Sequence, residues 1–260
     1  MNQVRQKFDE LKAKGRKAFI PYIMGGDPDL SKTATLLEML GETGADCIEI
    51  GVPFSDPLAD GPVIQQAAVR ALQNGCTFQK LIRVLKEVKI SKDVPLILMI
   101  YYNMMLQRGI REFMNETADS GCSGLIIPDL PPDEAAAVIQ CAAELQIALN
   151  FLVAPTSTPQ RISRAAEASS GFLYAVSLKG VTGIRSNLPP ELPGFIGRVQ
   201  SVTAIPVAVG FGISTPEQAA QVARLADGVI VGSAIVKAAA GDSSLGEVRN
   251  LAADLREAID

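Results

Sequence analysis

One acidic residue lies where an acid is unusual, inside a strongly apolar run. Glu49 stands between Ile48 and Ile50 in the run Cys47–Gly51. A buried carboxylate without a partner is costly, and desolvation raises its pKa toward the range in which a group can both give and take a proton. We therefore predict that Glu49 transfers protons in catalysis. The alternative is an ion pair that links layers of the core.

A second acid, Asp60, follows 11 residues later in a loop that three prolines stiffen. Asp60-Gly61-Pro62 is also typical of a turn and a helix start, so the residues alone slightly favour a capping role for Asp60. Asp27 and Asp129 follow other apolar runs, and both allow the same capping interpretation. Either of them would also help to position the loop that holds Asp60.

Two glycine-containing segments have the composition of a phosphate-binding site. Gly210–Ser214 reads Gly-Phe-Gly-Ile-Ser, and Gly232-Ser233-Ala234 opens a helical pattern. Free backbone amides at a helix N-terminus favour an anion, and glycine lets the backbone approach the anion's oxygens closely. Tight turns that bind no ligand remain the alternative.

Histidine is absent from the 260 residues, as is tryptophan. This excludes a catalytic unit built on histidine and a histidine-ligated metal, so proton transfer falls to carboxylates, Lys, Tyr, Cys or the substrate. The formal net charge of −4, with no basic stripe, argues against a nucleic-acid partner. The four cysteines lack metal-like spacing and are interpreted as buried thiols in a reducing cytoplasm.

No membrane segment or export signal is expected. The segment Met1–Lys17 is highly charged and has no apolar signal core. The longest apolar stretch, Val94–Leu106, contains a proline and an asparagine and is too short to span a bilayer. We therefore expect a soluble cytoplasmic protein.

Eight short apolar runs alternate with longer amphipathic segments. Their continuous hydrophobicity is typical of parallel strands buried on both faces. The expected strands are Ala18–Met24, Cys47–Gly51, Leu96–Tyr101, Gly124–Ile127, Ala148–Val153, Phe172–Ser177, Pro206–Gly210 and Gly228–Gly232. The expected helices are Ser31–Glu42, Pro62–Gln73, Phe78–Val88, Arg111–Asp119, Asp133–Leu145, Pro159–Ala168, Pro216–Ala226 and Leu245–Ile259.

Eight β/α alternations without a linker predict one domain over residues 1–260, a single (β/α)8 TIM barrel with an extra N-terminal helix. Such barrels bind substrate at the C-terminal ends of the strands, and phosphate after strands seven and eight. The long polar loop Gly180–Pro190 has the composition of a lid, with a plain connector as the alternative. Lys179 would allow Schiff-base chemistry, although a solvated lysine is commoner.

The segment Glu49–Pro62, which reads EIGVPFSDPLADGP, closely resembles the signature of the tryptophan synthase alpha chain family. Further motifs match that family in order, so the resemblance covers essentially the whole chain. They are Gly25–Pro28, Tyr101–Asn103, Ile127–Pro131, Ala154–Thr156, Gly180–Gly183, Gly210–Ile213 and Val231–Ala234.

The resemblance implies a TIM barrel that cleaves indole-3-glycerol phosphate to indole and glyceraldehyde 3-phosphate. It implies an alpha2-beta2 heterotetramer in which a beta chain holds pyridoxal phosphate and consumes the indole, with no cofactor in this chain. It also implies a retro-aldol reaction without metal or Schiff base, which makes Lys179 a bystander.

The resemblance further assigns roles to residues. Glu49 would protonate C3 of the indole ring and accept the hydroxyl proton, and Asp60 would accept a hydrogen bond from the indole N–H. The substrate pocket would be formed by Tyr22, Ile64, Ile126, Tyr174, Thr182 and Phe211, and the phosphate would be held by Gly183, Gly212, Gly232 and Ser233.

Four positions depart from the family pattern and are expected to affect affinity before activity: Tyr22, Met24, Gly25 and Met104. Three alternatives stay open. They are a free-standing lyase that needs no partner, a Schiff-base aldolase that uses Lys179, and a non-enzymatic phosphate-binding barrel that regulates a partner. The segment Phe54–Pro57 and the predicted lid are the expected contacts with a partner.

Overall fold

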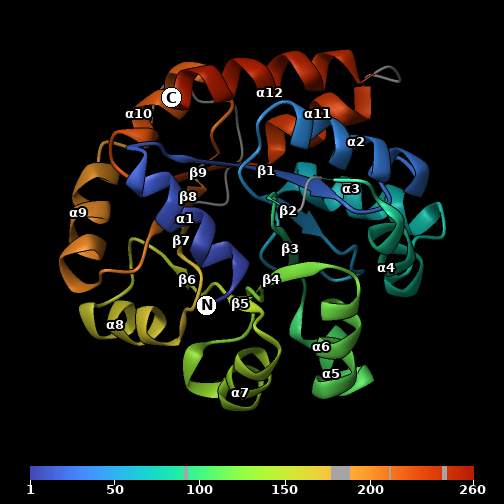
Figure 1. Cartoon of the computed structure of the whole chain (residues 1–260), viewed down its shortest axis with the longest axis horizontal. Helices are drawn as coiled ribbons and strands as arrows, with labels where there is room; N and C mark the ends of the chain where they lie inside the picture. Colours follow the sequence, from blue (N-terminus) through green and yellow to red (C-terminus); the bar gives the residue numbers. More distant parts are fainter. Residues whose placement is uncertain (91–92, 177–187, 211, 242–244) are drawn as a thin grey trace.

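The computed structural model describes residues 1–90, 93–176, 188–210, 212–241 and 245–260, and the structural statements below concern these residues. Within them, nine parallel strands form one sheet in the order β5-β4-β3-β2-β1-β9-β8-β7-β6. The strands are β1 Ala18–Met24, β2 Ile48–Gly51, β3 Leu96–Met99, β4 Cys122–Ile126, β5 Ala148–Leu149, β6 Leu152–Val153, β7 Leu173–Val176, β8 Val207–Gly210 and β9 Gly228–Val231. Helices surround these strands (Figure 1). The predicted TIM barrel is confirmed.

The two end strands of the sheet, β5 and β6, are halves of the single strand expected at Ala148–Val153. Asn150 lies between the two halves, and its side chain adds hydrogen bonds to the backbone on both sides of the segment. Its amide donates to the Leu125 carbonyl at 3.1 Å, and its oxygen accepts from the Phe172 N–H at 2.9 Å. The two ends of the sheet therefore meet at this segment, where the barrel closes, and the nine strands correspond to eight β/α units.

Most helices begin and end close to where the sequence predicts them. Their first turns carry the expected caps, such as the capping box at Thr215 and the proline that follows Thr158. The helices are α1 Gln3–Ala13, α2 Leu30–Glu42, α3 Pro62–Gln73, α4 Phe78–Glu87, α5 Tyr102–Arg108, α6 Ile110–Asp119, α7 Ala136–Leu145, α8 Pro159–Ala168, α9 Leu192–Val202, α10 Pro216–Ala223, α11 Ser233–Gly241 and α12 Gly246–Ile259. A 3-10 turn, Pro132–Glu134, precedes α7.

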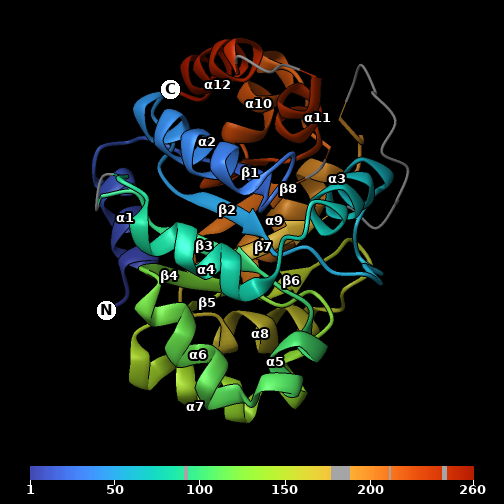
Figure 2. The same ribbon diagram turned by 90° about the vertical axis from the view of Figure 1, so that its right-hand side faces the viewer.

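The helix α1 closes one end of the barrel. Its apolar residues Val4, Phe8 and Leu11 belong to the same buried cluster as the residues that fill the barrel interior. In Figure 2, α1 lies at the end where the strands begin, and the arrow of β2 points to the opposite end. We call the end near α1 the base, and the end formed by the C-terminal ends of the strands and their loops the rim.

The buried side chains form two clusters, as a barrel requires. One cluster fills the interior above α1, where Phe8 packs against Phe172 with ring centroids 5.3 Å apart. The other lies between the strands and the outer helices. Strand residues that alternate along β2 therefore face either the interior or the helices, which places Cys47, Glu49 and Gly51 on one face.

The structure differs from the prediction at one strand end and in two helices. The strand expected at Leu96–Tyr101 ends at Met99, shortly before α5 begins at Tyr102. The sequence did not predict α5 or α9, whereas α11 begins at Ser233 as its opening motif predicts. No helix among the described residues has the length and hydropathy needed to cross a membrane.

Candidate active site

Glu49 is the buried acid at the centre of the candidate site. Its side chain is on β2, in register with Tyr22 on β1 and Ile97 on β3, and the residue is 0% exposed. Neither carboxylate oxygen has a hydrogen-bond partner among the described residues. Burial, with a smaller effect from the negative charge of Asp60, raises the pKa of Glu49 to about 8. At neutral pH the group therefore holds a proton that it can donate.

Asp60 approaches Glu49 from the loop that follows β2. Gly61, and not Asp60, is the N-cap residue of α3, and no side chain caps that helix. The capping interpretation of Asp60 is therefore wrong. Burial raises the pKa of Asp60, while a hydrogen bond with Tyr101 lowers it.

Two tyrosines stand beside the two acids. Burial raises the pKa of Tyr22 and of Tyr174, and in both cases the negative charges of Asp60 and Glu49 raise it further. Because both acids act on both tyrosines, four predicted site residues lie near one another: Tyr22, Glu49, Asp60 and Tyr174.

Two glycines make room for the tyrosine hydroxyls. A Cβ atom on Gly51 would collide with the hydroxyl of Tyr22, and one on Gly210 would lie 2.7 Å from the hydroxyl of Tyr174. Side chains at these two positions would displace both rings. Glycine at the ends of β2 and β8 is therefore a steric requirement of this site.

Tyr101 is a site residue that the sequence did not single out. It is 5% exposed, its ring stacks on Phe54 with centroids 5.1 Å apart, and its hydroxyl accepts from the Ala59 N–H at 3.0 Å. The Asp60 carboxylate lies close to the same hydroxyl, and this proximity lowers the pKa of Asp60. Its place at the end of a predicted strand, on the rim, was the available signal.

The glycine segments predicted to hold phosphate follow neighbouring strands. Gly212 follows β8 with a φ of +66°, and Gly232 follows β9 directly before α11. The Gly232 carbonyl accepts from the Val236 N–H at 3.0 Å, which leaves the first amides of α11, beginning at Ser233, without carbonyl partners inside the helix. Such amides favour an anion.

The remaining predicted residues divide into two groups. Ile126 is fully buried at the end of β4, and Ile64 is 9% exposed on α3, so both are at positions compatible with a pocket wall or with core packing. Thr182, Gly183, Phe211 and Lys179 lie outside the described residues. The same holds for most of the predicted lid, Gly180–Pro190.

The acids Asp27 and Asp129 have structural partners at the rim. Asp27, which is buried, accepts two hydrogen bonds from Arg70 of α3, both at 2.8 Å. Asp129 accepts from the Tyr102 N–H at 2.9 and 3.1 Å. Asp27 therefore fastens the loop after β1 to α3, and Asp129 caps α5.

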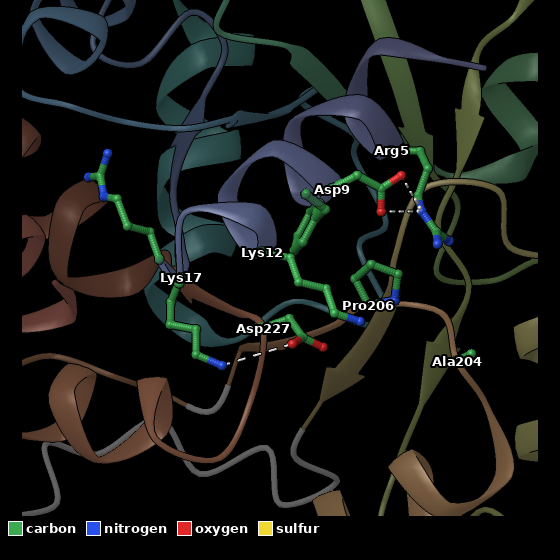
Figure 3. Close-up of a pocket in the computed structure, with 10 residues that line it drawn as sticks. Arg5, Asp9, Lys12, Lys17, Ala204, Pro206 and Asp227 are labelled. Atoms are coloured by element: carbon green, nitrogen blue, oxygen red, sulfur yellow. Dashed lines mark hydrogen bonds and ion pairs between the residues drawn. The ribbon is translucent and has the colours of Figure 1, made fainter.

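A cavity of about 150 Å³ lies at the base of the barrel, and neither Glu49 nor Asp60 lines it. Figure 3 shows residues that line this cavity. Its charged residues are largely paired: Arg5 with Asp9 at 3.1 Å and Lys17 with Asp227 at 3.9 Å. It contains none of the predicted site residues. Among the described residues, no cluster of three or more acids or cysteines could hold a metal ion.

Comparisons with known proteins agree with this geometry. A family model described as "Tryptophan synthase alpha chain" matches residues 8–258. The tryptophan synthase alpha chain of Geobacter sulfurreducens is 45% identical over 262 residues, which cover 100% of this chain and 99% of the relative. That of Trichormus variabilis is 48% identical over 238 residues, 91% of this chain and 90% of the relative.

Solved structures give the same result. A chain of Mycobacterium tuberculosis tryptophan synthase superposes with a TM-score of 0.90 at 39% identity, covering 99% of this chain and 98% of that one. Tryptophan synthase subunit alpha from Legionella pneumophila superposes with a TM-score of 0.91 at 37% identity, covering 100% and 99%. The chain belongs to the tryptophan synthase alpha chain family.

Proposed function

We propose that this chain is the alpha subunit of a tryptophan synthase and cleaves indole-3-glycerol phosphate to indole and glyceraldehyde 3-phosphate. One observation carries the proposal: a fully buried glutamate, without a hydrogen-bond partner in the described part of the chain, stands beside a second acid at the rim of a TIM barrel. A buried acid that contributes no pairing to stability is expected to be retained for chemistry.

Glu49 is proposed to act twice. As a neutral acid it donates its proton to C3 of the indole ring, which makes the ring a better leaving group. As a carboxylate it then accepts the proton of the side-chain hydroxyl, and the C–C bond breaks as that hydroxyl becomes the aldehyde. A pKa of about 8 suits both steps, because the energies of the two protonation states are then close near neutral pH.

Asp60 is proposed to accept a hydrogen bond from the indole N–H and to stabilise the positive charge that develops on the protonated ring. A carboxylate in a half-buried place does this better than a solvated one, because the local dielectric is low. Tyr22, Ile64, Ile126 and Tyr174 would contact the substrate, together with Thr182 and Phe211.

The substrate phosphate is proposed to lie on the amides of Gly212, Gly232 and Ser233, with Gly183 completing the site. The rim ends of β8 and β9 are adjacent, so one phosphate can reach both glycine segments. A phosphate held there would orient the reacting end of the substrate toward β2.

The quaternary organisation belongs to the same proposal. The chain would act as one barrel domain in the cytoplasm, in an alpha2-beta2 heterotetramer with a beta chain that binds pyridoxal phosphate. The alpha reaction would need no cofactor, metal or Schiff base, because carboxylates supply the proton transfers. Exposed Leu58 lies directly after the segment Phe54–Pro57, which we propose as a partner contact.

Indole release by the Glu49→Gln variant tests the function. The amide keeps the shape of the side chain and removes the proton transfer, so turnover should fall by about a thousandfold while substrate still binds. Glu87→Gln, at an exposed position at the end of α4, is the matched control and should be as active as the unmodified chain. Full activity of Glu49→Gln would refute the proposal.

Two further assays separate the alternatives. Turnover measured with and without a beta chain distinguishes an alpha subunit, which a partner should activate strongly, from a free-standing lyase. Borohydride in the presence of substrate should leave the protein unmodified. Covalent trapping at Lys179 would instead support a Schiff-base aldolase.

A further inference from the structure

Asp129, in the loop after β4, supplies a cap that α5 lacks. The N-cap residue of α5 is Tyr101, whose side chain makes no capping hydrogen bond. Both carboxylate oxygens of Asp129 instead accept from the Tyr102 N–H, at 2.9 and 3.1 Å. An aspartate that is 27 residues distant in the sequence therefore fixes where this helix begins.

The capped turn carries the side chain that holds the Asp60 loop. Tyr101 immediately precedes the capped amide, and its hydroxyl accepts from the N–H of Ala59, the residue directly before Asp60, at 3.0 Å. Its ring stacks on Phe54, near the other end of the same loop. Tyr101 therefore contacts the loop after β2 at both of its ends.

These contacts join three consecutive loops of the rim. The strands β2, β3 and β4 are neighbours in the sheet. Asp60 lies in the loop after β2, Tyr101 follows β3, and Asp129 lies in the loop after β4. A shift of the α5 start would move the Tyr101 ring, and the ring would carry Ala59 and Asp60 with it. Misplacement of a substrate-contacting group by about 1 Å can cost a hundredfold in rate.

We infer that Asp129 is a positioning residue for the lyase reaction, and that it sets the place of the Asp60 carboxylate through Tyr101. The inference rests on the proposed function, because indole release is its readout. An ordinary helix cap would stabilise α5 and leave kcat and KM unchanged.

Kinetics of single and double variants test the inference. Asp129→Ala and Tyr101→Phe should each lower kcat/KM for indole-3-glycerol phosphate about tenfold. Asp129→Asn keeps an acceptor oxygen and should restore most of the loss. The kcat/KM of the double variant Asp129→Ala/Tyr101→Phe should be no lower than that of the less active single variant, because both changes break the same link.

A second helix cap provides the control. Thr158 caps α8 by accepting from the Arg161 N–H, so Thr158→Ala should lower the melting temperature and leave kcat and KM unchanged. If Asp129→Ala does not fold, Asp129→Ser, which offers a weaker cap, replaces it in the same cycle.

Two results would overturn the inference: unchanged kcat and KM in the Asp129 variants, or strictly multiplicative losses in the double variant. Failure of the proposed function is distinguishable, because the unmodified chain itself would then release no indole.

Discussion

Two buried acids, one just before β2 and one inside it, are in opposite situations. At the base, Asp46 is 9% exposed and accepts from the Phe19 N–H at 2.9 Å and from Arg256 at 2.6 Å. Toward the rim, Glu49 is 0% exposed and has no partner among the described residues. Only three positions separate the two acids in the sequence.

The pKa causes differ in the same way. Burial raises the pKa of Asp46, while the Phe19 N–H and the positive charge of Arg256 lower it again. For Glu49, burial and the negative charge of Asp60 both raise the pKa, and no described residue lowers it. At the base, hydrogen bonds and positive charge therefore stabilise the Asp46 carboxylate. Toward the rim, Glu49 stays ready to exchange a proton.

The base also connects its acid to the rest of the chain. Arg256 on α12 donates to Asp260 at 2.7 Å, and Asp260 in turn pairs with Arg16 at 2.8 Å. This network ties the last helix to the start of β1 and β2. Asp46, which stabilises the fold, is therefore paired, whereas Glu49, for which chemistry is proposed, has no partner among the described residues.

The same substitution at Asp60 and at Asp46 should separate the two roles. Asp60→Asn removes the charge proposed to face the indole N–H, so turnover should fall between about a hundredfold and a thousandfold. Asp46→Asn, as the matched control, should leave turnover per folded molecule unchanged. Steady-state indole release, normalised to folded protein, measures both. Equal losses of turnover in the two variants would show that Asp60 and Asp46 do not have different roles.

The stability effects should run the other way. Asp46→Asn leaves the buried Arg256 without its closest carboxylate and should lower the free energy of unfolding by about 3 kcal/mol. Denaturant unfolding followed by circular dichroism measures it. Asp60→Asn, which breaks no ion pair among the described residues, serves as the comparison and should change stability by less. A loss that is larger at Asp60 would contradict this prediction.

The raised pKa of Glu49 also predicts a pH dependence of stability. The folded pKa is about 8 and the unfolded value is 4.5, so between these limits the native state holds a proton that the unfolded state has lost. Stability contributed by this group is therefore full below pH 4.5 and falls as the pH rises toward 8.

Between pH 5.5 and 7, the unmodified chain should lose about 2 kcal/mol of unfolding free energy relative to Glu49→Gln. Denaturant unfolding of both proteins at the two pH values measures this difference. Parallel pH profiles of the two proteins would show that Glu49 does not titrate in this window.

Much of the fold was predictable because it depends on local patterns. Continuous apolar runs located the strands, and capping residues such as Thr158 and Thr215 located helix starts. The break at Asn150 was not predictable, since the partners of this side chain, such as the Leu125 carbonyl, belong to other segments of the barrel. The helix α5 was missed because its cap, Asp129, comes from a different loop.

The candidate site was predictable to the extent that one residue is conspicuous by itself. Glu49 stands out in any apolar run, and the resemblance to a known family identified Asp60. Tyr101 was missed because its role depends on Ala59, 42 residues away, and an aromatic residue at a strand end is usually core. Contacts between loops of different β/α units exist only after the barrel has closed.

The most direct test of the central claim is the protonation state of Glu49 itself. Its carboxyl signal can be followed from pH 5 to pH 10 by carbon NMR or infrared difference spectroscopy, with Glu49→Gln identifying the signal by its loss. We predict a titration with a pKa of about 8, so that the group is protonated at pH 6. A Glu49 that is already ionised at pH 6 would contradict the claim that this acid is buried, unpaired and ready to donate its proton.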